Sequence, residues 1–264
     1  MKKIYMLGNL SRNYLSPLMI LLSFTYFMIV CVGNTIGAAR GMSNSLFDYI
    51  VNLREGGSCG NGLLLFGVLP ILALLLPLLM DRMENEMIVT RLQNKRALLY
   101  EHFLFSIGIS VIFTSLMMLV GIVTAFVETG RLTNLWGTKE GMLYFLLDNK
   151  STFSAYIPHV TSGKIWLYVL ASRFLAILFI AMFIIFLKLV LKKNIYVLFV
   201  SLVLFASDGY VSTDTPIFIR KIDISIETWL KPNDQLFNLI YFIVWIFLLF
   251  LVSMKQYDKK EFYH

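Results

Sequence analysis

The stretch LLLFGVLPILALLLPLLM (63–80), DRMENEMIVTRLQNKRALLYEH (81–102) and FLFSIGISVIFTSLMMLVGIVTAF (103–126) decides the fold. Two long apolar runs enclose a charged segment. Each run is long enough to cross a bilayer as a helix, so the charged segment between them must lie outside the hydrocarbon. The same alternation recurs along the chain and predicts an all-α integral membrane protein.

The composition excludes an ordinary soluble domain. Of the 264 residues, 58% are hydrophobic and only 15% are charged, and the mean hydropathy is +0.74. Soluble domains average about 25% charged residues. The net charge of +7 does not indicate a nucleic-acid partner, because the apolar runs leave no room for a soluble domain with a basic stripe.

The apolar runs predict six transmembrane helices in a single transmembrane domain, 1–264. The N-terminal MKK resembles the start of a signal peptide, but the apolar run after it is too long for a typical signal-peptide core, so we expect a retained first span. The predicted fifth span is short. The predicted spans are about 14–34, 62–80, 103–127, 165–187, 195–207 and 236–254.

The distribution of basic residues predicts the orientation. Taken together, residues 1–13, 81–102, 188–194 and the C-terminal tail hold thirteen bases and six acids, whereas the longer loops on the other side hold about as many acids as bases. Short basic segments stay in the cytoplasm. Both termini are therefore predicted to be cytoplasmic. Apolar residues of the N-terminal segment recur at helical spacing and predict an amphipathic N-terminal helix on the membrane surface: Ile4, Leu7, Leu10 and Tyr14.

The charged segment 81–102 has a helical charge pattern. Glu84, Ile88, Arg91 and Lys95 follow steps of three and four residues, so most charges would share one helix face and could pair with each other. An amphipathic helix held between two spans is suited to contact a soluble partner. The alternative is a solvated linker, and the pattern leaves both open.

Two features inside the predicted spans suggest sites. Pro70 and Pro77 should kink the second span, either as a hinge or as prolines that a membrane helix simply tolerates. Arg173 lies about 12 Å below the outer end of the fourth span. In a functional role, a guanidinium at that depth would line a cavity or contact an anionic group. In a structural role, it would snorkel outward to the interface or bond the backbone of a neighbouring helix.

Catalytic signals are missing from the sequence. No predicted span contains Asp or Glu, and His102, His159 and His264 lack the spacing of metal ligands. Gly163-Lys164 is followed by Ile165 rather than by Ser or Thr, so no phosphate-binding loop of the ATPase type is present. We therefore expect no catalytic residue, no metal site and no cofactor on this chain, and no enzyme activity of its own.

The tryptophans and cysteines carry weaker expectations. Trp136, Trp166 and Trp229 are predicted to anchor the outer membrane interface. Cys31 and Cys59 should lie near the same membrane face, which leaves a single disulfide open.

Three segments together resemble the type-2 ABC transporter permease family, the six-span membrane subunits of bacterial exporters. The resemblance rests on an amphipathic segment before the first span, a charged loop between the second and third spans, and an outer section before the last span. These segments are KKIYMLGNLSRNYL (2–15), ENEMIVTRLQNKRALL (84–99) and VSTDTPIFIRKIDISIETWLKP (211–232).

The resemblance implies a function and partners. It implies a cytoplasmic ABC ATPase that holds ATP and Mg, a second permease subunit (identical or similar), and a cavity between subunits lined by the first, second and fifth spans. Amphipathic or hydrophobic cargo, such as an antimicrobial peptide or a drug, would cross the bacterial cytoplasmic membrane. The coupling helix that docks on the ATPase would include Glu84, Glu86, Arg91, Lys95 and Arg96.

A different class of protein also fits the sequence. A non-transport membrane scaffold or immunity protein would act through its outer loops and would need no ATPase. The presence or absence of a companion ATPase discriminates the two hypotheses.

Overall fold

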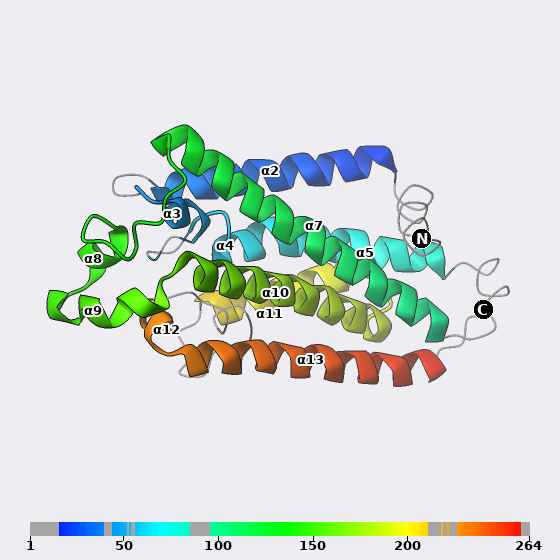
Figure 1. Cartoon of the computed structure of the whole chain (residues 1–264). Coiled ribbons are helices and arrows are strands. Elements are labelled where there is room, and N and C mark those ends of the chain that lie inside the picture. The colour runs from blue at the N-terminus through cyan, green and yellow to red at the C-terminus, as the bar shows by residue number, and fades with distance from the viewer. Residues whose placement is uncertain are drawn as a thin grey trace, which may run out of the picture.

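The computed structural model describes residues 16–39, 44–51, 53, 56–84, 96–210, 218, 221 and 226–259. Within these ranges every regular element is helical. Long helices run side by side along one axis, and short helices gather at one end (Figure 1). The expectation of an all-α protein is confirmed for the described residues.

Five helical rods in the described part are long and apolar enough to cross a membrane. A sixth apolar helix, α11 (Asn194–Tyr210), has 17 residues and is therefore about 25 Å long, less than the roughly 30 Å of a hydrocarbon core. The second rod joins α4 (Asn61–Leu63), a π-helical turn (Leu64–Val68) and α5. The other long helices are α2 (Pro17–Ala39), α5 (Leu69–Met83), α7 (Arg96–Thr129), α10 (Ser162–Val190) and α13 (Pro232–Lys259).

The helices extend beyond the predicted spans. α7 begins at Arg96, so the last part of the charged segment 81–102 forms the first turns of a spanning helix. Hydropathy locates the apolar part of a helix, whereas its backbone hydrogen bonds continue into polar surroundings. The predicted N-terminal amphipathic helix and residues 85–95 lie outside the described residues.

α10 is the central helix. It packs against α5, α7, α11 and α13. Seven consecutive residues, 176–182, are buried, as expected for a helix that is apolar on all sides. The Phe179 ring lies 5.3 Å from Phe242 of α13, 6.1 Å from Phe205 of α11 and 5.7 Å from Phe218, measured between centroids.

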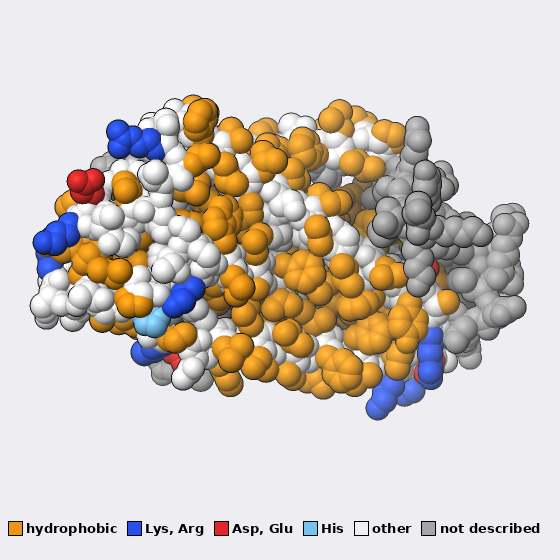
Figure 2. Space-filling model, viewed as in Figure 1, with side chains coloured by type: hydrophobic (Ala, Val, Ile, Leu, Met, Phe, Trp, Pro, Cys, Tyr) orange, Lys and Arg blue, Asp and Glu red, His pale blue; other side chains and the backbone are white. Residues whose placement is uncertain are grey.

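The outer helices present apolar side chains to the surroundings. Hydrophobic side chains cover the middle of the molecule, and charged ones gather toward its ends (Figure 2). An exposed apolar surface of this extent marks contact with a membrane or a partner rather than with water. Examples on α2 and α13 are Leu18, Leu21, Ile29, Leu236, Phe237 and Phe247.

The two ends of the helix bundle differ. The cap end carries the short helices α3 (Leu46–Ile50), α8 (Met142–Leu146), α9 (Phe153–Tyr156) and α12 (Ile226–Leu230). At the other end, which we call the basic end, α5, α10 and α13 finish and α2, α7 and α11 begin. The described bases here are Arg82, Arg96, Lys188, Lys192, Lys193, Lys255 and Lys259.

The packing of α3 on α7 requires a glycine and generates the first prediction. A Cβ on Gly121 would meet the Ser58 hydroxyl and would lie 2.7 Å from Cγ1 of Ile50, whereas a Cβ on Gly33 of α2 would meet nothing within 4 Å. Gly33→Ala should be neutral or stabilising by up to about 1 kcal/mol through helix propensity. Gly121→Ala should destabilise by ~1–3 kcal/mol through overpacking. Thermal unfolding followed by circular dichroism compares them, and equal melting temperatures would contradict this packing.

Candidate functional site

A polar network at the basic end joins three helix ends. Lys188 at the end of α10 lies 2.6 Å from an Asp81 carboxylate oxygen of α5. The same ammonium donates to the carbonyl of Lys192 and to the Asn194 side chain, and Asn194 donates to Asp81 at 2.7 Å. The Lys188 side chain is only 6% exposed. Since Lys188 contacts the turn, Asn194 of α11 and Asp81 of α5, the network fixes the α10–α11 turn against α5. Removing one partner would leave a buried charge uncompensated.

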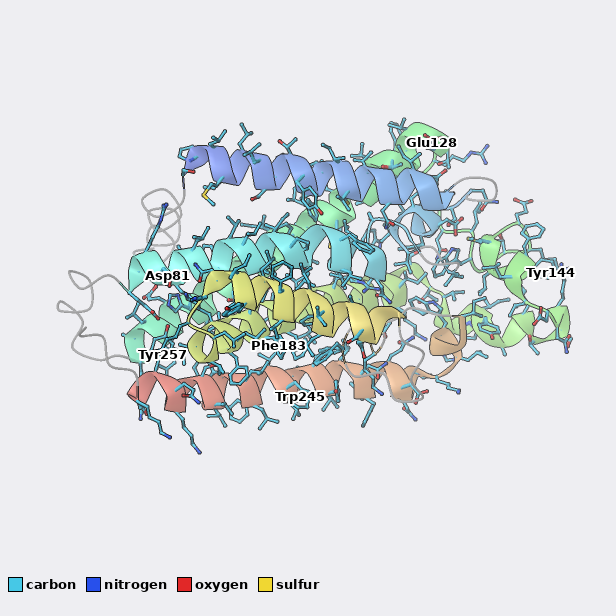
Figure 3. The ribbon with its side chains drawn as sticks, turned by 180° about the vertical axis from the view of Figure 1, so that it is seen from behind. Asp81, Glu128, Tyr144, Phe183, Trp245 and Tyr257 are labelled. Carbon is cyan, nitrogen blue, oxygen red and sulfur yellow. The ribbon has the colours of Figure 1, made fainter. Side chains whose placement is uncertain are left out.

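Two further contacts tie α13 to the residues on either side of 85–95. The Tyr257 hydroxyl donates to the Glu84 carboxylate at 2.7 Å, just after α5 ends. Arg96, the first residue of α7, donates from Nε and Nη2 to Asp258 at 2.8 and 2.7 Å. We call these two contacts the latch. Figure 3 shows Asp81 and Tyr257 at the same end of the molecule, opposite Tyr144 in the cap.

The two contacts of the latch differ in exposure. Arg96 and Asp258 have side chains that are 47% and 41% exposed, and ion pairs at that exposure contribute little to stability. The two parallel hydrogen bonds fix the orientation of the Arg96 guanidinium on the Asp258 carboxylate more than they add to stability. The Arg96–Asp258 contact is therefore the weaker half of the latch, whereas the Tyr257 side chain that donates to Glu84 is fully buried.

The structure places two of the five predicted coupling residues. Glu84 and Arg96 both contact the last turn of α13. The sequence pattern suggested that the charges of 81–102 could pair with one another, but these two pair with a helix far along the chain, and Asp81 pairs with Lys188. Glu86, Arg91 and Lys95 lie outside the described residues.

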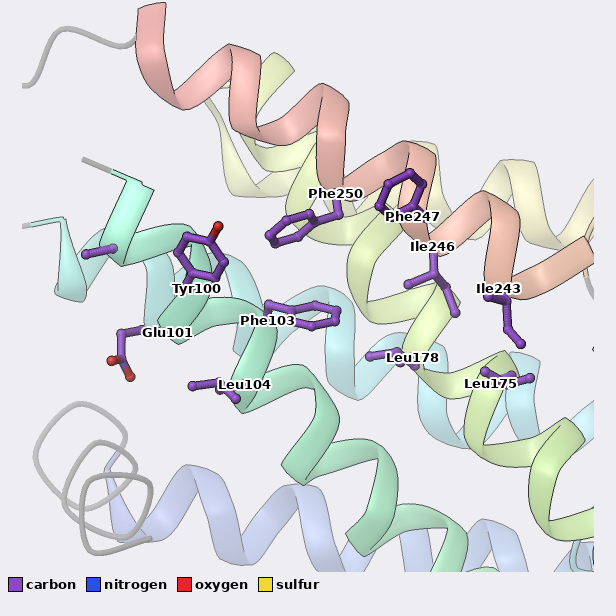
Figure 4. Close-up of a pocket in the computed structure, with 11 residues that line it drawn as sticks. Tyr100, Glu101, Phe103, Leu104, Leu175, Leu178, Ile243, Ile246, Phe247 and Phe250 are labelled. Atoms are coloured by element: carbon purple, nitrogen blue, oxygen red, sulfur yellow. The ribbon is translucent and has the colours of Figure 1, made fainter. Parts of the chain in front are cut away.

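A lateral groove of about 750 Å³ lies between α7 and α13, with α10 as its floor (Figure 4). Its volume is within the range of ligand-binding pockets. The family resemblance implied a different cavity, between two subunits and lined by the first, second and fifth spans; that expectation concerns a dimer and stays a prediction. The groove is lined by Ala97, Tyr100, Glu101, Phe103, Leu104, Leu175, Leu178, Ile243, Ile246, Phe247 and Phe250.

Arg173 is packed inside the bundle. It is 1% exposed, and its Nη1 donates to the Asn61 side chain at the start of α4, at 2.9 Å. It therefore does not snorkel outward, and it does not line the lateral groove. Of the alternatives that the sequence left open for Arg173, the burial excludes outward snorkelling, and a role at an anionic group or a cavity stays a prediction. The contact joins α10 to the second rod.

The prolines of the second span differ in their surroundings. Pro70 follows the π-helical turn, and Pro77 is buried inside α5. A proline at position 70 has no N–H to donate to the carbonyl of Phe66, four residues earlier. That carbonyl accepts a 2.5 Å hydrogen bond from the Tyr26 hydroxyl of α2. No sequence pattern pointed to Tyr26, and the hinge role of Pro70 and Pro77 stays a prediction.

The cap is built on a buried aspartate that sequence reasoning missed. The Asp48 carboxylate is fully buried and accepts from Trp136 Nε1 at 2.6 Å and from the backbone N–H groups of Ser45 and Asn44 at 3.0 and 3.1 Å. Burial raises the pKa of Asp48 above its ordinary value, and the Trp136 hydrogen bond partly opposes that rise. The capping box formed by Ser45 and Asp48 was the available sequence signal.

The tryptophan prediction is wrong for two of the three residues. Trp136 and Trp229 are fully buried and pack edge to face with centroids 5.7 Å apart. Trp229 packs in the same way on Tyr168 of α10. These rings form the core of the cap because they stack on each other and, for Trp136, because Asp48 accepts the indole N–H.

The cysteines are free and buried. Cys59 Sγ lies 3.8 Å from the sulfur of Met118 on α7, and burial raises the pKa of the Cys59 thiol to about 11. The disulfide that the sequence left open is not formed. Among the described residues, no three His, Cys, Asp or Glu side chains are grouped to hold a metal ion.

These features define a class. A chain whose described residues form only helices, five of them membrane-capable rods with apolar side chains exposed on their outer faces, is a multi-pass membrane protein. No protein-family model, no curated protein and no solved structure matches the chain. Its function is therefore argued from its own residues.

The Tyr26 contact generates a prediction that uses both partners. Tyr26→Phe should lower the free energy of unfolding by ~0.5–1.5 kcal/mol, because the Phe66 carbonyl loses a donor. Pro70→Ala restores a backbone N–H at position 70. The loss caused by Tyr26→Phe should then be smaller in the Pro70→Ala background, as measured by unfolding in mixed micelles. Equal losses in both backgrounds would show that the hydroxyl does not compensate for the proline.

The Asp48 contact predicts a pH-dependent loss. Trp136→Phe removes one donor and raises the pKa of Asp48 further, since that hydrogen bond lowers it. A raised folded-state pKa means that the buried carboxylate is costly above that pKa and that protonation relieves the cost as pH falls. The variant should lose about 1.5–3 kcal/mol at neutral pH, and less at mildly acidic pH.

A matched control separates the hydrogen bond from ring volume. Trp229 is also buried, but its Nε1 has no acceptor among the described residues. Trp229→Phe should therefore lose stability by a similar amount at both pH values. Melting temperatures at the two pH values decide the matter, and a pH-independent loss for Trp136→Phe would contradict the assignment.

Proposed function

We propose that the chain is the membrane-spanning permease subunit of an ABC exporter, driven by a separate cytoplasmic ATPase. The observation that carries the proposal is the arrangement around residues 85–95. Both flanks of that segment contact the last turn of α13 through the latch, and Asp81 just before it joins the α10–α11 turn. A protein bound to 85–95 would therefore act on five helix ends at once.

The proposed topology has six spans, with α11 as the short one. Its Asp208 is buried near the cap end and accepts from the backbone N–H of Phe218, so the helix could end among protein groups rather than in lipid. The basic end would face the cytoplasm, because short basic segments are retained there. Both termini would then lie in the cytoplasm. The membrane that the chain spans would be the bacterial cell membrane.

The proposed mechanism is alternating access. ATP and Mg would be held by the partner ATPase, and the chain itself would carry no catalysis. Nucleotide-driven movement of residues 84–96 would open the latch, the exposed Arg96–Asp258 pair first, and tilt α13 and α7 relative to α10. A second permease subunit, identical or similar, would complete the transport path for an amphipathic or hydrophobic cargo. Pro70, beside the π-helical turn, would be the place where the second rod bends.

The cap supports a second candidate. A folded external cap with a buried Asp48–Trp136 contact is a surface that a scaffold or immunity protein could use. Such a protein would need no ATPase, so the same experiment discriminates the two.

The test is co-purification with candidate ATPases. The double variant Glu84→Lys/Glu86→Lys should reduce the amount of ATPase retained in detergent by roughly tenfold or more, as expected for loss of charged contacts at an interface. Tyr257→Phe removes the latch hydroxyl without changing charge, and should alter transport-coupled ATPase activity more than retention. Glu140→Lys, exposed in the cap, is the charge control.

Two results would contradict the proposal. One is an ATPase retained equally by the wild type and by the Glu84/Glu86 variant. The other is a chain that purifies without any ATPase, which would favour the scaffold or immunity function.

A further inference from the structure

Three sulfur atoms from separate segments of the chain gather toward the cap end of the bundle. The Cys59 Sγ, in the loop before α4, lies 3.8 Å from the sulfur of Met118 on α7. The thiol of Cys31 on α2 points at the carbonyl of Ser58, the residue before Cys59, at 4.0 Å. The two cysteines are close enough to interact electrostatically, and all three sulfur-bearing side chains are buried. The fold thus brings both thiols of the chain together with one thioether.

The loop that carries Cys59 is held firmly in place. The backbone N–H groups of Ser58 and Cys59 donate to two carbonyls of α3, each at 2.8 Å. The Asn34 side chain of α2 donates to the carbonyl of Gly57 at 2.7 Å. α3 itself packs against α2 and α7 (Figure 1). Ligands held by a rigid surrounding structure lose little freedom when an ion binds, so this support favours a binding site.

The chemistry of the three side chains selects soft metal ions. Thiolate and thioether sulfurs prefer soft ions such as Cu(I) to the hard ions Mg²⁺ and Ca²⁺. With metal–sulfur bonds of about 2.3 Å, three sulfurs around one ion stand about 4 Å apart. The 3.8 Å between the Cys59 and Met118 sulfurs matches that spacing. The expectation of no metal site rested on histidine spacing, which does not bear on sulfur ligands.

A nearby positive charge favours a monovalent ion. Burial raises the pKa of the Cys59 thiol to about 11, and the charge of Arg173 opposes that rise, so the guanidinium acts on this thiol. Metal binding displaces the thiol protons, which would leave two negative charges in the site. One monovalent cation together with Arg173 would neutralise them. A divalent ion would leave a net positive charge buried, which is costly.

We propose that Cys31, Cys59 and Met118 bind one soft monovalent metal cation, Cu(I). The ion would form bonds to two thiolates and one thioether, and the two thiol protons would pass to solvent. The site would join α2 to α7 and to the loop before α4. Since α2 is the least buried of the five membrane-capable rods, this join would fix the first span against the bundle. The inference goes beyond the proposed function and requires no ATPase.

The test is a competition for Cu(I). The purified full chain, without a histidine tag and without an ATPase, is titrated anaerobically in detergent with ascorbate, against the coloured Cu(I) complex of bicinchoninate. The wild type should withdraw one equivalent of Cu(I) per chain. Cys31→Ser and Cys59→Ser should each weaken binding by roughly hundredfold, and Met118→Leu, which conserves volume, by roughly tenfold.

Met117→Leu is the matched control. Met117 is also buried on α7, but in the described part of the chain its sulfur makes no contact with Cys59 such as the one Met118 makes. The substitution should leave Cu(I) binding unchanged. Size-exclusion chromatography verifies that each variant is folded. Equal weakening by Met117→Leu and Met118→Leu would contradict the assignment of the third ligand.

X-ray absorption at the copper edge decides the matter on the wild type, even where a serine variant does not fold. The loaded chain should show three sulfur ligands at about 2.3 Å and no nitrogen. Nitrogen ligands would place the copper on histidines and overturn the inference. So would a wild type that withdraws no copper from bicinchoninate, or serine variants that bind as well as the wild type. Since no ATPase is present, none of these results depends on the co-purification test.

Discussion

Backbone hydrogen bonding in an apolar medium is the constraint on which the rest of this structure depends. In hydrocarbon no water is available to satisfy an N–H or C=O group, so each must find a partner within the protein. Pro70 breaks that rule locally, and Tyr26 of another helix donates to the Phe66 carbonyl that Pro70 cannot reach. Ser106 similarly donates to the carbonyl of His102, at 2.9 Å within α7. Polar side chains in the rods thus act first as partners of the backbone.

The same constraint explains why the buried charges lie at contacts between helices. Arg173 reaches Asn61 of the second rod, and Lys188 reaches Asp81 and Asn194. A charge inside the bundle needs a polar partner from a neighbouring element, because its own helix has already used its backbone groups. Both contacts originate on α10. They orient the central helix in a way that its uniformly apolar surface cannot.

The sequence predicted what depends on local pattern and failed where partners are distant. Long apolar runs located the five membrane-capable rods, because bilayer thickness sets their length. Tyr26–Phe66 and Asp48–Trp136 join residues 40 and 88 positions apart, and no periodicity encodes such pairs. The prediction that Trp136 and Trp229 anchor the membrane interface was wrong for the same reason. Position in the sequence indicates nearness to the interface, whereas burial depends on which distant segments pack over the ring. One hydrogen-bond partner of Glu84, Tyr257, is 173 residues away, and no local charge pattern could have indicated it.

The latch and the lateral groove involve the same ends of α7 and α13. Arg96 and Tyr100 are four residues apart and therefore lie on one face of α7, and Phe250 precedes Asp258 by about two turns of α13. A movement that separates α7 from α13 at the groove would strain the Arg96–Asp258 pair, and a partner that opens that pair would change the width of the groove. Such coupling is reciprocal by thermodynamic necessity. Because the Arg96–Asp258 pair is exposed, it is the weaker of the two latch contacts and the one that such a movement would break first.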